Sequence, residues 1–96
     1  MGYILALDLG TTGIRAVLFG ADGQPQLSAY RELPQIYPQP GWVEHDPLVI
    51  WNLTREVIAA VTGGTGRQVV ALGLTNQRET CVLWDQATGK PLYNAL

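Results

Sequence analysis

Residues 7–16 read LDLGTTGIRA, a stretch in which an acid, two glycines and two threonines stand between apolar runs. The run before it, residues 3–7, is continuously apolar, which is typical of a central strand buried on both faces. The run after it, residues 14–19, alternates so that Ile14, Ala16 and Leu18 share one face. The stretch therefore predicts a turn between two paired strands.

A third strand and one helix are expected next. Residues 20–25, GADGQP, carry the Asp-Gly pair of a hairpin connection, and residues 27–33, LSAYREL, follow as a strand. The prolines of residues 34–47 exclude a regular element until Asp46, which can cap a helix that has Pro47 at its first position. We expect this helix to end at two glycines and to bury one stripe of residues: Ile50, Leu53, Val57, Ala60 and Val61.

Two further strands are expected after the helix. Residues 69–75, VVALGLT, follow a helical crossover and so predict a strand parallel to an earlier one. Residues 80–85, TCVLWD, alternate into a turn at residues 86–91 and predict a last strand. The fold class is α/β, with a mixed sheet in which an antiparallel meander precedes a helix and a parallel strand. One helix covers only one face of such a sheet, so we expect a piece of a longer protein or a chain that needs a partner.

Composition limits the classes of partner. The 96 residues have a net charge of −2 and their six basic residues are scattered, which argues against nucleic acid and anionic membranes. No apolar run approaches the roughly 20 residues of a membrane span, and we expect a cytoplasmic protein. The lone Cys81 is expected to be a buried strand thiol rather than a nucleophile.

The turn in residues 7–16 has a chemistry suited to phosphate, although it is neither a P-loop nor a dinucleotide-binding motif. Its glycines let backbone amides turn toward an anion, and its threonines add hydroxyl donors. Asp8 would hold Mg²⁺ through water, and Arg15 would compensate phosphate charge. The alternative is an ordinary hairpin in which Asp8 caps its own backbone and Arg15 is solvated.

A second polar stretch, TNQRET at residues 75–80, follows the predicted parallel strand. Arg78 only donates and Glu79 only accepts, so together they match the paired hydroxyls of a polyol. The alternative is an exposed ion pair on a loop. His45 has no second ligand nearby and is interpreted as a loop or packing residue, and Trp42 and Trp51 as loop and helix anchors.

Five segments carry a family resemblance: ALDLGTT, RAV, IYPQPGWVEHDP, NQRET and TGKPLYNA. In order and spacing they resemble the N-terminus of the FGGY carbohydrate kinases, and most specifically of the members that phosphorylate glycerol. This family belongs to the actin-like ATPase, ribonuclease-H-like superfamily. The resemblance implies that residues 1–96 form the N-terminal part of the kinase's N-terminal domain, an incomplete lobe without the C-terminal domain.

The resemblance also implies an activity: transfer of the γ-phosphoryl group of ATP to glycerol, giving ADP and sn-glycerol 3-phosphate. The full-length protein would be a homo-oligomer, and its general base would lie beyond Leu96, so the 96-residue chain would be inactive alone. The implied roles are nucleotide binding by Thr11, Thr12, Gly13 and Arg15, Mg²⁺ binding by Asp8, and glycerol binding by Arg78 and Glu79.

Two positions depart from the family pattern DQGTTS. Leu9 replaces glutamine, and Gly13 replaces serine, which removes a hydroxyl but keeps a backbone amide. These departures leave open a kinase for another polyol or a ketose. The length of 96 residues leaves open a second alternative, a non-catalytic remnant that acts at most as an interaction domain.

Overall fold

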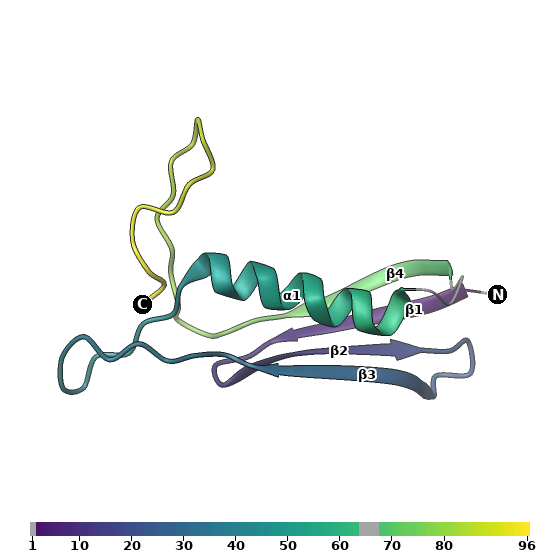
Figure 1. Ribbon diagram of the computed structural model, residues 1–96. Coiled ribbons are helices and arrows are strands. Elements are labelled where there is room, and N and C mark those ends of the chain that lie inside the picture. Colours follow the sequence, from purple (N-terminus) through teal and green to yellow (C-terminus); the bar gives the residue numbers. More distant parts are fainter. Residues whose placement is uncertain (1, 64–67) are drawn as a thin grey trace.

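The computed structural model describes residues 2–63 and 68–96 (Figure 1). Its elements are β1 (Gly2–Leu9), β2 (Gly13–Phe19), β3 (Pro25–Glu32), α1 (Pro47–Thr62) and β4 (Gln68–Thr75). The strands form one mixed sheet in the order β3–β2–β1–β4. The expected meander, helix and parallel strand are confirmed.

Strand β1 is the central strand of this sheet. It pairs antiparallel with β2 and parallel with β4, and β2 pairs antiparallel with β3. Leu5 and Leu7 are buried on the face that also buries Ile14, Ala16 and Leu18 of β2. Successive residues of a strand point to opposite faces, so Asp8 and Arg15 belong to the other face.

Helix α1 begins at the predicted cap. The Asp46 side chain accepts a hydrogen bond from the Leu48 amide at 2.9 Å, which satisfies a donor that the first turn would otherwise leave unpaired. The predicted buried stripe is partly wrong. Val57 and Val61 are buried, but Ala60 is exposed and Thr54 is buried in its place.

Thr54 can take that position because its hydroxyl donates to the Ile50 carbonyl at 2.7 Å, so no polar atom is buried without a partner. Gly63 caps the end of the helix, donating to the Ala59 carbonyl at 2.7 Å. Gly64, the second glycine expected to end the helix, lies outside the described residues.

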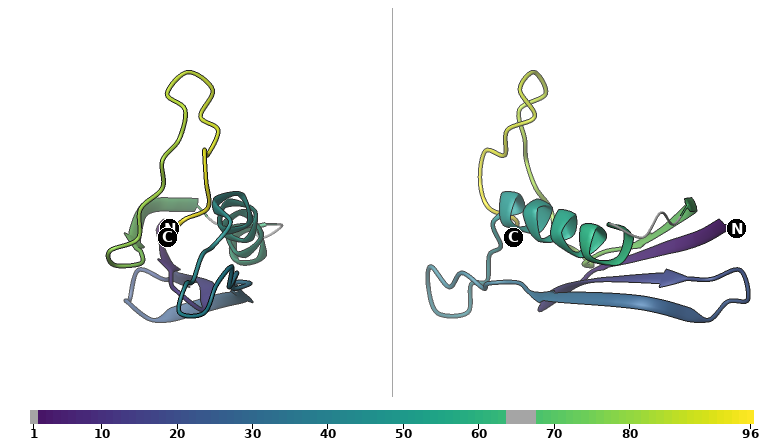
Figure 2. Two further views of the ribbon diagram at one scale, coloured as in Figure 1. Left: turned by 90° about the vertical axis from the view of Figure 1, so that its left-hand side faces the viewer. Right: turned by 45° about the vertical axis from the view of Figure 1, so that its right-hand side comes forward.

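The sheet is covered on one face only. Figure 2 shows α1 lying along one side, where it packs mainly on β2 and β3. Every residue of β4 is exposed, including Val70, Leu72 and Leu74. The fold is thus an open, partial α/β domain. No helix in the described residues is long and apolar enough to cross a membrane.

The predicted strand at residues 80–85 is wrong. The chain leaves the sheet after β4 and folds back on itself, with the Leu92 amide donating to the Leu83 carbonyl at 2.9 Å (Figure 2). Its backbone groups thus pair within the segment rather than with the edge of the sheet. Cys81 is consequently exposed, not a buried strand thiol.

The tryptophans are not the buried anchors that we expected. Trp42 lies near the tip of the proline-rich loop and is 51% exposed, and Trp51 is 56% exposed on the outer side of α1. Residues 50, 54, 57 and 61 form the inward stripe of the helix, and position 51 falls outside it.

Candidate functional site

One end of the sheet gathers most of the predicted site residues. The strands β1 and β4 both finish there, and the turn at residues 10–12 leads from β1 into β2 (Figure 1). Asp8 is the last polar residue of β1, and it lies in register with Thr75 on one side and Arg15 on the other. The β2–β3 turn with Asp22 lies at the opposite end.

The carbonyl groups of the turn anchor it to other segments of the chain. Three successive carbonyls accept hydrogen bonds from residues far along the chain. These bonds are Gln77 Nε2 to Gly10 O at 3.1 Å, Gln35 Nε2 to Thr11 O at 2.9 Å and the Leu33 amide to Thr12 O at 2.9 Å. A fourth bond, from the Gly10 amide to the Gly13 carbonyl at 3.0 Å, closes the turn itself.

These bonds decide where the amides of the turn point. In a trans peptide the N–H points away from the C=O of the same unit, so fixing the Gly10 and Thr11 carbonyls aims the amides of Thr11 and Thr12 outward. Neither amide and neither threonine hydroxyl has a hydrogen-bond partner among the described residues, and both residues are exposed. Outward amides in a tight turn form an anion-binding concavity.

A polar row crosses the uncovered face of the sheet beside this turn. Thr75, Asp8, Arg15 and Tyr30 are successive partners on β4, β1, β2 and β3. The Arg15 guanidinium lies over the Tyr30 ring, with Cζ 4.7 Å from the ring centroid. In the described residues the one ion pair is Arg31 with Glu56, so Arg15 does not neutralise Asp8.

Asp8 is left with a carboxylate suited to a metal ion. It makes no hydrogen bond in the described part of the chain, so it does not cap its own backbone. Residues 2–63 and 68–96 hold no cluster of three metal-ligating side chains. A single carboxylate beside an anion site fits Mg²⁺, which keeps several waters and binds through one or two carboxylates and substrate phosphates.

Gly13 is required by the position of Tyr30. A Cβ added at residue 13 would overlap the hydroxyl and ring of Tyr30, which lies diagonally across β2 and β3. Gly13 lacks the hydroxyl of the serine in the family pattern, and the phenolic hydroxyl of Tyr30 lies over its backbone instead. The sequence does not single out Tyr30, because its contact with Gly13 depends on strand register rather than on a local motif.

Gly13→Ser is expected to lower the free energy of unfolding by about 1 kcal/mol, since Tyr30 must swing away and lose its contact with Arg15. Urea unfolding of Gly13→Ser, Tyr30→Ala and the double variant measures the coupling, and serine should cost little once Tyr30 is absent. Gly73→Ala is the control, because nothing lies within 4 Å of a Cβ at that strand glycine. Equal costs of serine in both backgrounds would contradict the overlap.

The loop after β4, residues 76–80, presents Arg78 and Glu79. Both are exposed and they form no ion pair with each other, so the alternative of a surface salt bridge is not realised. Glu79 has φ of 58°, the one positive φ outside glycine in the described residues. Left-handed backbone costs a non-glycine residue roughly 1–2 kcal/mol and is concentrated at functional sites.

Polar side chains pack beneath this loop and beneath the segment near the C-terminus. Gln77 donates to the turn and accepts a hydrogen bond from the Thr80 hydroxyl at 2.8 Å, and it also contacts the buried His45. The buried Glu44 accepts hydrogen bonds from Tyr93 Oη and Asn94 Nδ2, both at 3.0 Å. The hydrogen bond to Glu44, reinforced by its negative charge, raises the pKa of Tyr93 above its ordinary value.

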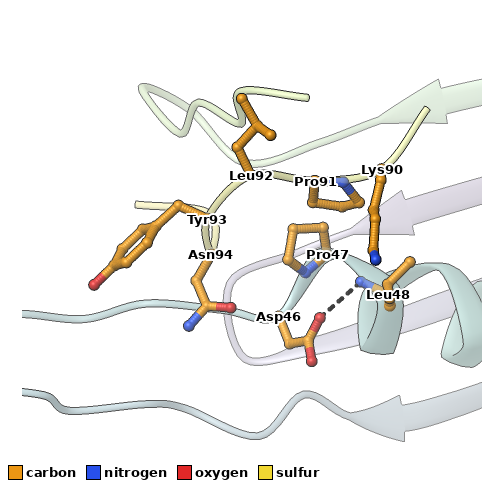
Figure 3. Close-up of a pocket in the computed structure, with 8 residues that line it drawn as sticks. All are labelled: Asp46, Pro47, Leu48, Lys90, Pro91, Leu92, Tyr93 and Asn94. Atoms are coloured by element: carbon orange, nitrogen blue, oxygen red, sulfur yellow. Dashed lines mark hydrogen bonds between the residues drawn. The ribbon is translucent and has the colours of Figure 1, made fainter. Parts of the chain in front are cut away.

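Two pockets lie near these loops. Figure 3 shows one of about 220 Å³ between the start of α1 and the segment from Lys90 to Asn94. Asp46 already caps the helix there, and none of the predicted site residues lines it. A second pocket of about 190 Å³ is lined by Asn76, Gln77 and Thr80, and thus adjoins the loop that carries Arg78 and Glu79.

Comparisons with known proteins show the family of the chain. The model of the N-terminal domain of the FGGY family of carbohydrate kinases matches residues 3–96. A glycerol kinase of Gloeobacter violaceus is 65% identical over 95 residues, and one of Acaryochloris marina is 59% identical over 97. These matches cover 99% and 98% of this chain but only 19% of each relative.

Solved structures share the fold. A ligand-bound xylulose kinase of Lactobacillus acidophilus superposes with a TM-score of 0.92 at 25% identity, over 100% of this chain and 19% of that one. A Plasmodium falciparum glycerol kinase with ADP superposes with a TM-score of 0.88 at 34% identity, over 100% of this chain and 20% of that one. The actin-like ATPase fold expected from the sequence is confirmed.

Proposed function

The chain belongs to the FGGY family of carbohydrate kinases, and from this premise we propose that it forms the N-terminal part of an ATP-dependent glycerol kinase. The observation that carries the proposal is the pair of unpartnered amides at Thr11 and Thr12, fixed outward by their carbonyl anchors. A phosphate donor bound there would lie next to the loop that carries Arg78 and Glu79, because Gln77 joins that loop to the turn.

On the nucleotide side, Thr11, Thr12 and Gly13 would donate to phosphate oxygens of ATP, and Arg15 would add positive charge. Asp8 would hold the Mg²⁺ ion through water. When bound, this ion supplies neutralisation of the charge on the phosphates. Tyr30 keeps Arg15 away from Asp8, so that the carboxylate and the guanidinium are both free for their ligands.

On the acceptor side, Arg78 would donate to glycerol hydroxyls and Glu79 would accept from them. Since a hydroxyl does both, the pair can hold neighbouring hydroxyls and orient the primary one toward the γ-phosphoryl group. Transfer to that hydroxyl gives ADP and sn-glycerol 3-phosphate. A reaction that consumes ATP places the protein, in this proposal, in the cytoplasm.

Assays of the full-length protein with Mg-ATP and a panel of acceptors test the substrate. We expect kcat/KM for glycerol to exceed that for other polyols and for ketoses by about 100-fold or more, because a site built for paired hydroxyls rejects poor matches. The structural likeness to a xylulose kinase makes a ketose the second candidate. Preference for D-xylulose over glycerol would replace the proposed substrate.

The 96-residue chain alone is proposed to be inactive on glycerol, since positioning of acceptor, metal and phosphates requires groups that the resemblance places outside it. Calorimetric titration of the chain with Mg-ATP separates this proposal from a non-catalytic remnant. Binding that is lost in Asp8→Asn would contradict the hypothesis of a non-catalytic remnant.

Light scattering of the full-length protein tests whether it is the homo-oligomer that the family resemblance implies.

A further inference from the structure

A buried histidine joins the two loops of the candidate site. His45 is 4% exposed, and its two ring nitrogens contact side chains from opposite directions. Nε2 lies 2.9 Å from Gln35 Oε1, and Nδ1 lies 3.1 Å from Gln77 Nε2. Gln35 binds the Thr11 carbonyl, and Gln77 binds the Gly10 carbonyl. The three side chains thus close a ring of hydrogen bonds behind the turn.

The backbone fixes which atom donates in each contact. Carbonyls only accept, so the nitrogens of Gln35 and Gln77 must be the atoms that face Leu33, Thr11 and Gly10. Gln77 therefore donates to Nδ1 of His45, and Gln35 offers its oxygen to Nε2. This pattern is satisfied only by a neutral imidazole that carries its proton on Nε2.

The ring reaches both sides of the reaction. Gln35 and Gln77 both bind carbonyls of the turn with the outward amides, and Gln77 also directly precedes Arg78 in the acceptor loop. The backbone of His45 is fixed independently, since it exchanges two hydrogen bonds with Ala95 at 3.0 and 2.7 Å. Its ring can therefore act as a rigid strut that holds the side chains of Gln35 and Gln77 in place, although the two loops are far apart in the sequence.

We propose that His45 is a positioning residue that sets the distance between the nucleotide turn, residues 10–13, and the acceptor loop, residues 76–80. The expected effect on kcat rests on the proposed kinase function, whereas the positioning of the two loops by His45 does not. His45 touches neither substrate in this proposal. It determines kcat by holding two sites in register, because misplacement of reacting groups by about 1 Å can cost about 100-fold.

Three substitutions separate the two halves of the strut. His45→Ala removes both contacts. His45→Asn places an amide oxygen near the position of Nδ1 and so keeps the contact with Gln77, whereas His45→Gln places an amide nitrogen near Nε2 and keeps the contact with Gln35. Gln39→Ala is the control, because Gln39 is an exposed residue of the same proline-rich loop.

In the full-length protein, His45→Ala is expected to lower kcat by about 10- to 100-fold while the KM values for glycerol and Mg-ATP change by less than about 3-fold. His45→Asn and His45→Gln should both fall between His45→Ala and wild type, because each retains one contact. A kcat of folded His45→Ala within about 2-fold of wild type would overturn the proposal, even if its melting temperature fell.

Backbone amide chemical shifts test the geometry without using activity. His45→Gln, which loses the contact with Gln77, should shift the amide resonances of residues 76–80 but not those of residues 33–36, and His45→Asn, which loses the contact with Gln35, should do the reverse. His45→Ala should affect both segments, and Gln39→Ala neither. Equal changes in both segments for all three variants of His45 would overturn the proposal. If the pattern of shifts is found while glycerol is not phosphorylated, the proposed function fails and the positioning role of His45 is retained.

Discussion

Asp8→Asn is expected to lower kcat by about 100-fold or more and to leave KM for glycerol within about 3-fold of wild type. Asparagine keeps the size of the side chain and removes its charge. The exposed Asp8 carboxylate has neither an ion pair nor a hydrogen bond in the described residues, so little structure depends on that charge. The loss should therefore appear in turnover, where the phosphates need a correctly held cation.

Steady-state kinetics over a range of Mg²⁺ concentration measures this effect. The variant should need more Mg²⁺ to reach half of its own maximal rate, because Asp8 is the acidic ligand that the proposal assigns to the ion. Asp22→Asn is the matched control, since Asp22 lies in the turn at the opposite end of the sheet and binds a backbone amide that asparagine can also bind. A rise in KM for glycerol alone would contradict the metal role of Asp8.

Arg78→Ala and Glu79→Ala are each expected to lower kcat/KM for glycerol by about 10- to 100-fold, since each removes hydrogen bonds between a charged group and a hydroxyl. Neither side chain has a partner in the described part of the chain, so the loss should not come from unfolding. KM for Mg-ATP should change little. Initial rates with glycerol varied at saturating Mg-ATP measure the effect.

Two comparisons sharpen this test. Glu56→Ala removes a half-exposed carboxylate from the surface ion pair with Arg31 and should leave glycerol kinetics unchanged. Glu79→Gly should lose activity as Glu79→Ala does but raise the free energy of unfolding by about 1 kcal/mol relative to it, because glycine adopts the φ of 58° without steric cost. Normal kinetics of Arg78→Ala and Glu79→Ala would remove the glycerol-site assignment.

Much of the fold could be predicted because its signals are local. The continuous apolar run of β1, the alternation in β2 and the Asp46-Pro47 cap each follow from neighbouring residues. The failures involve long-range choices. Residues 80–85 alternate as a strand would, yet their backbone pairs with residues 90–92 instead of the sheet. Ala60 fits an apolar stripe, but the exact rotation of α1 buries Thr54.

The candidate site divides in the same way. Residues whose chemistry is evident from a motif, such as Asp8 and Arg78, could be named from the sequence, and their roles remain predictions. The residues that support them could not be named from the sequence. Gln35, His45 and Gln77 are separated by 10 and 32 positions, and Tyr30 meets Gly13 through strand register. No local pattern encodes such contacts.

The carbonyl anchors of the turn also bear on how its sequence can vary. The directions of the Thr11 and Thr12 amides are set by Gln35 and Gln77, which lie outside the turn. Replacement of either glutamine should therefore disturb the turn, although neither residue belongs to it. Gene libraries randomised at positions 35 and 77 would show this dependence as strong selection for glutamine at both.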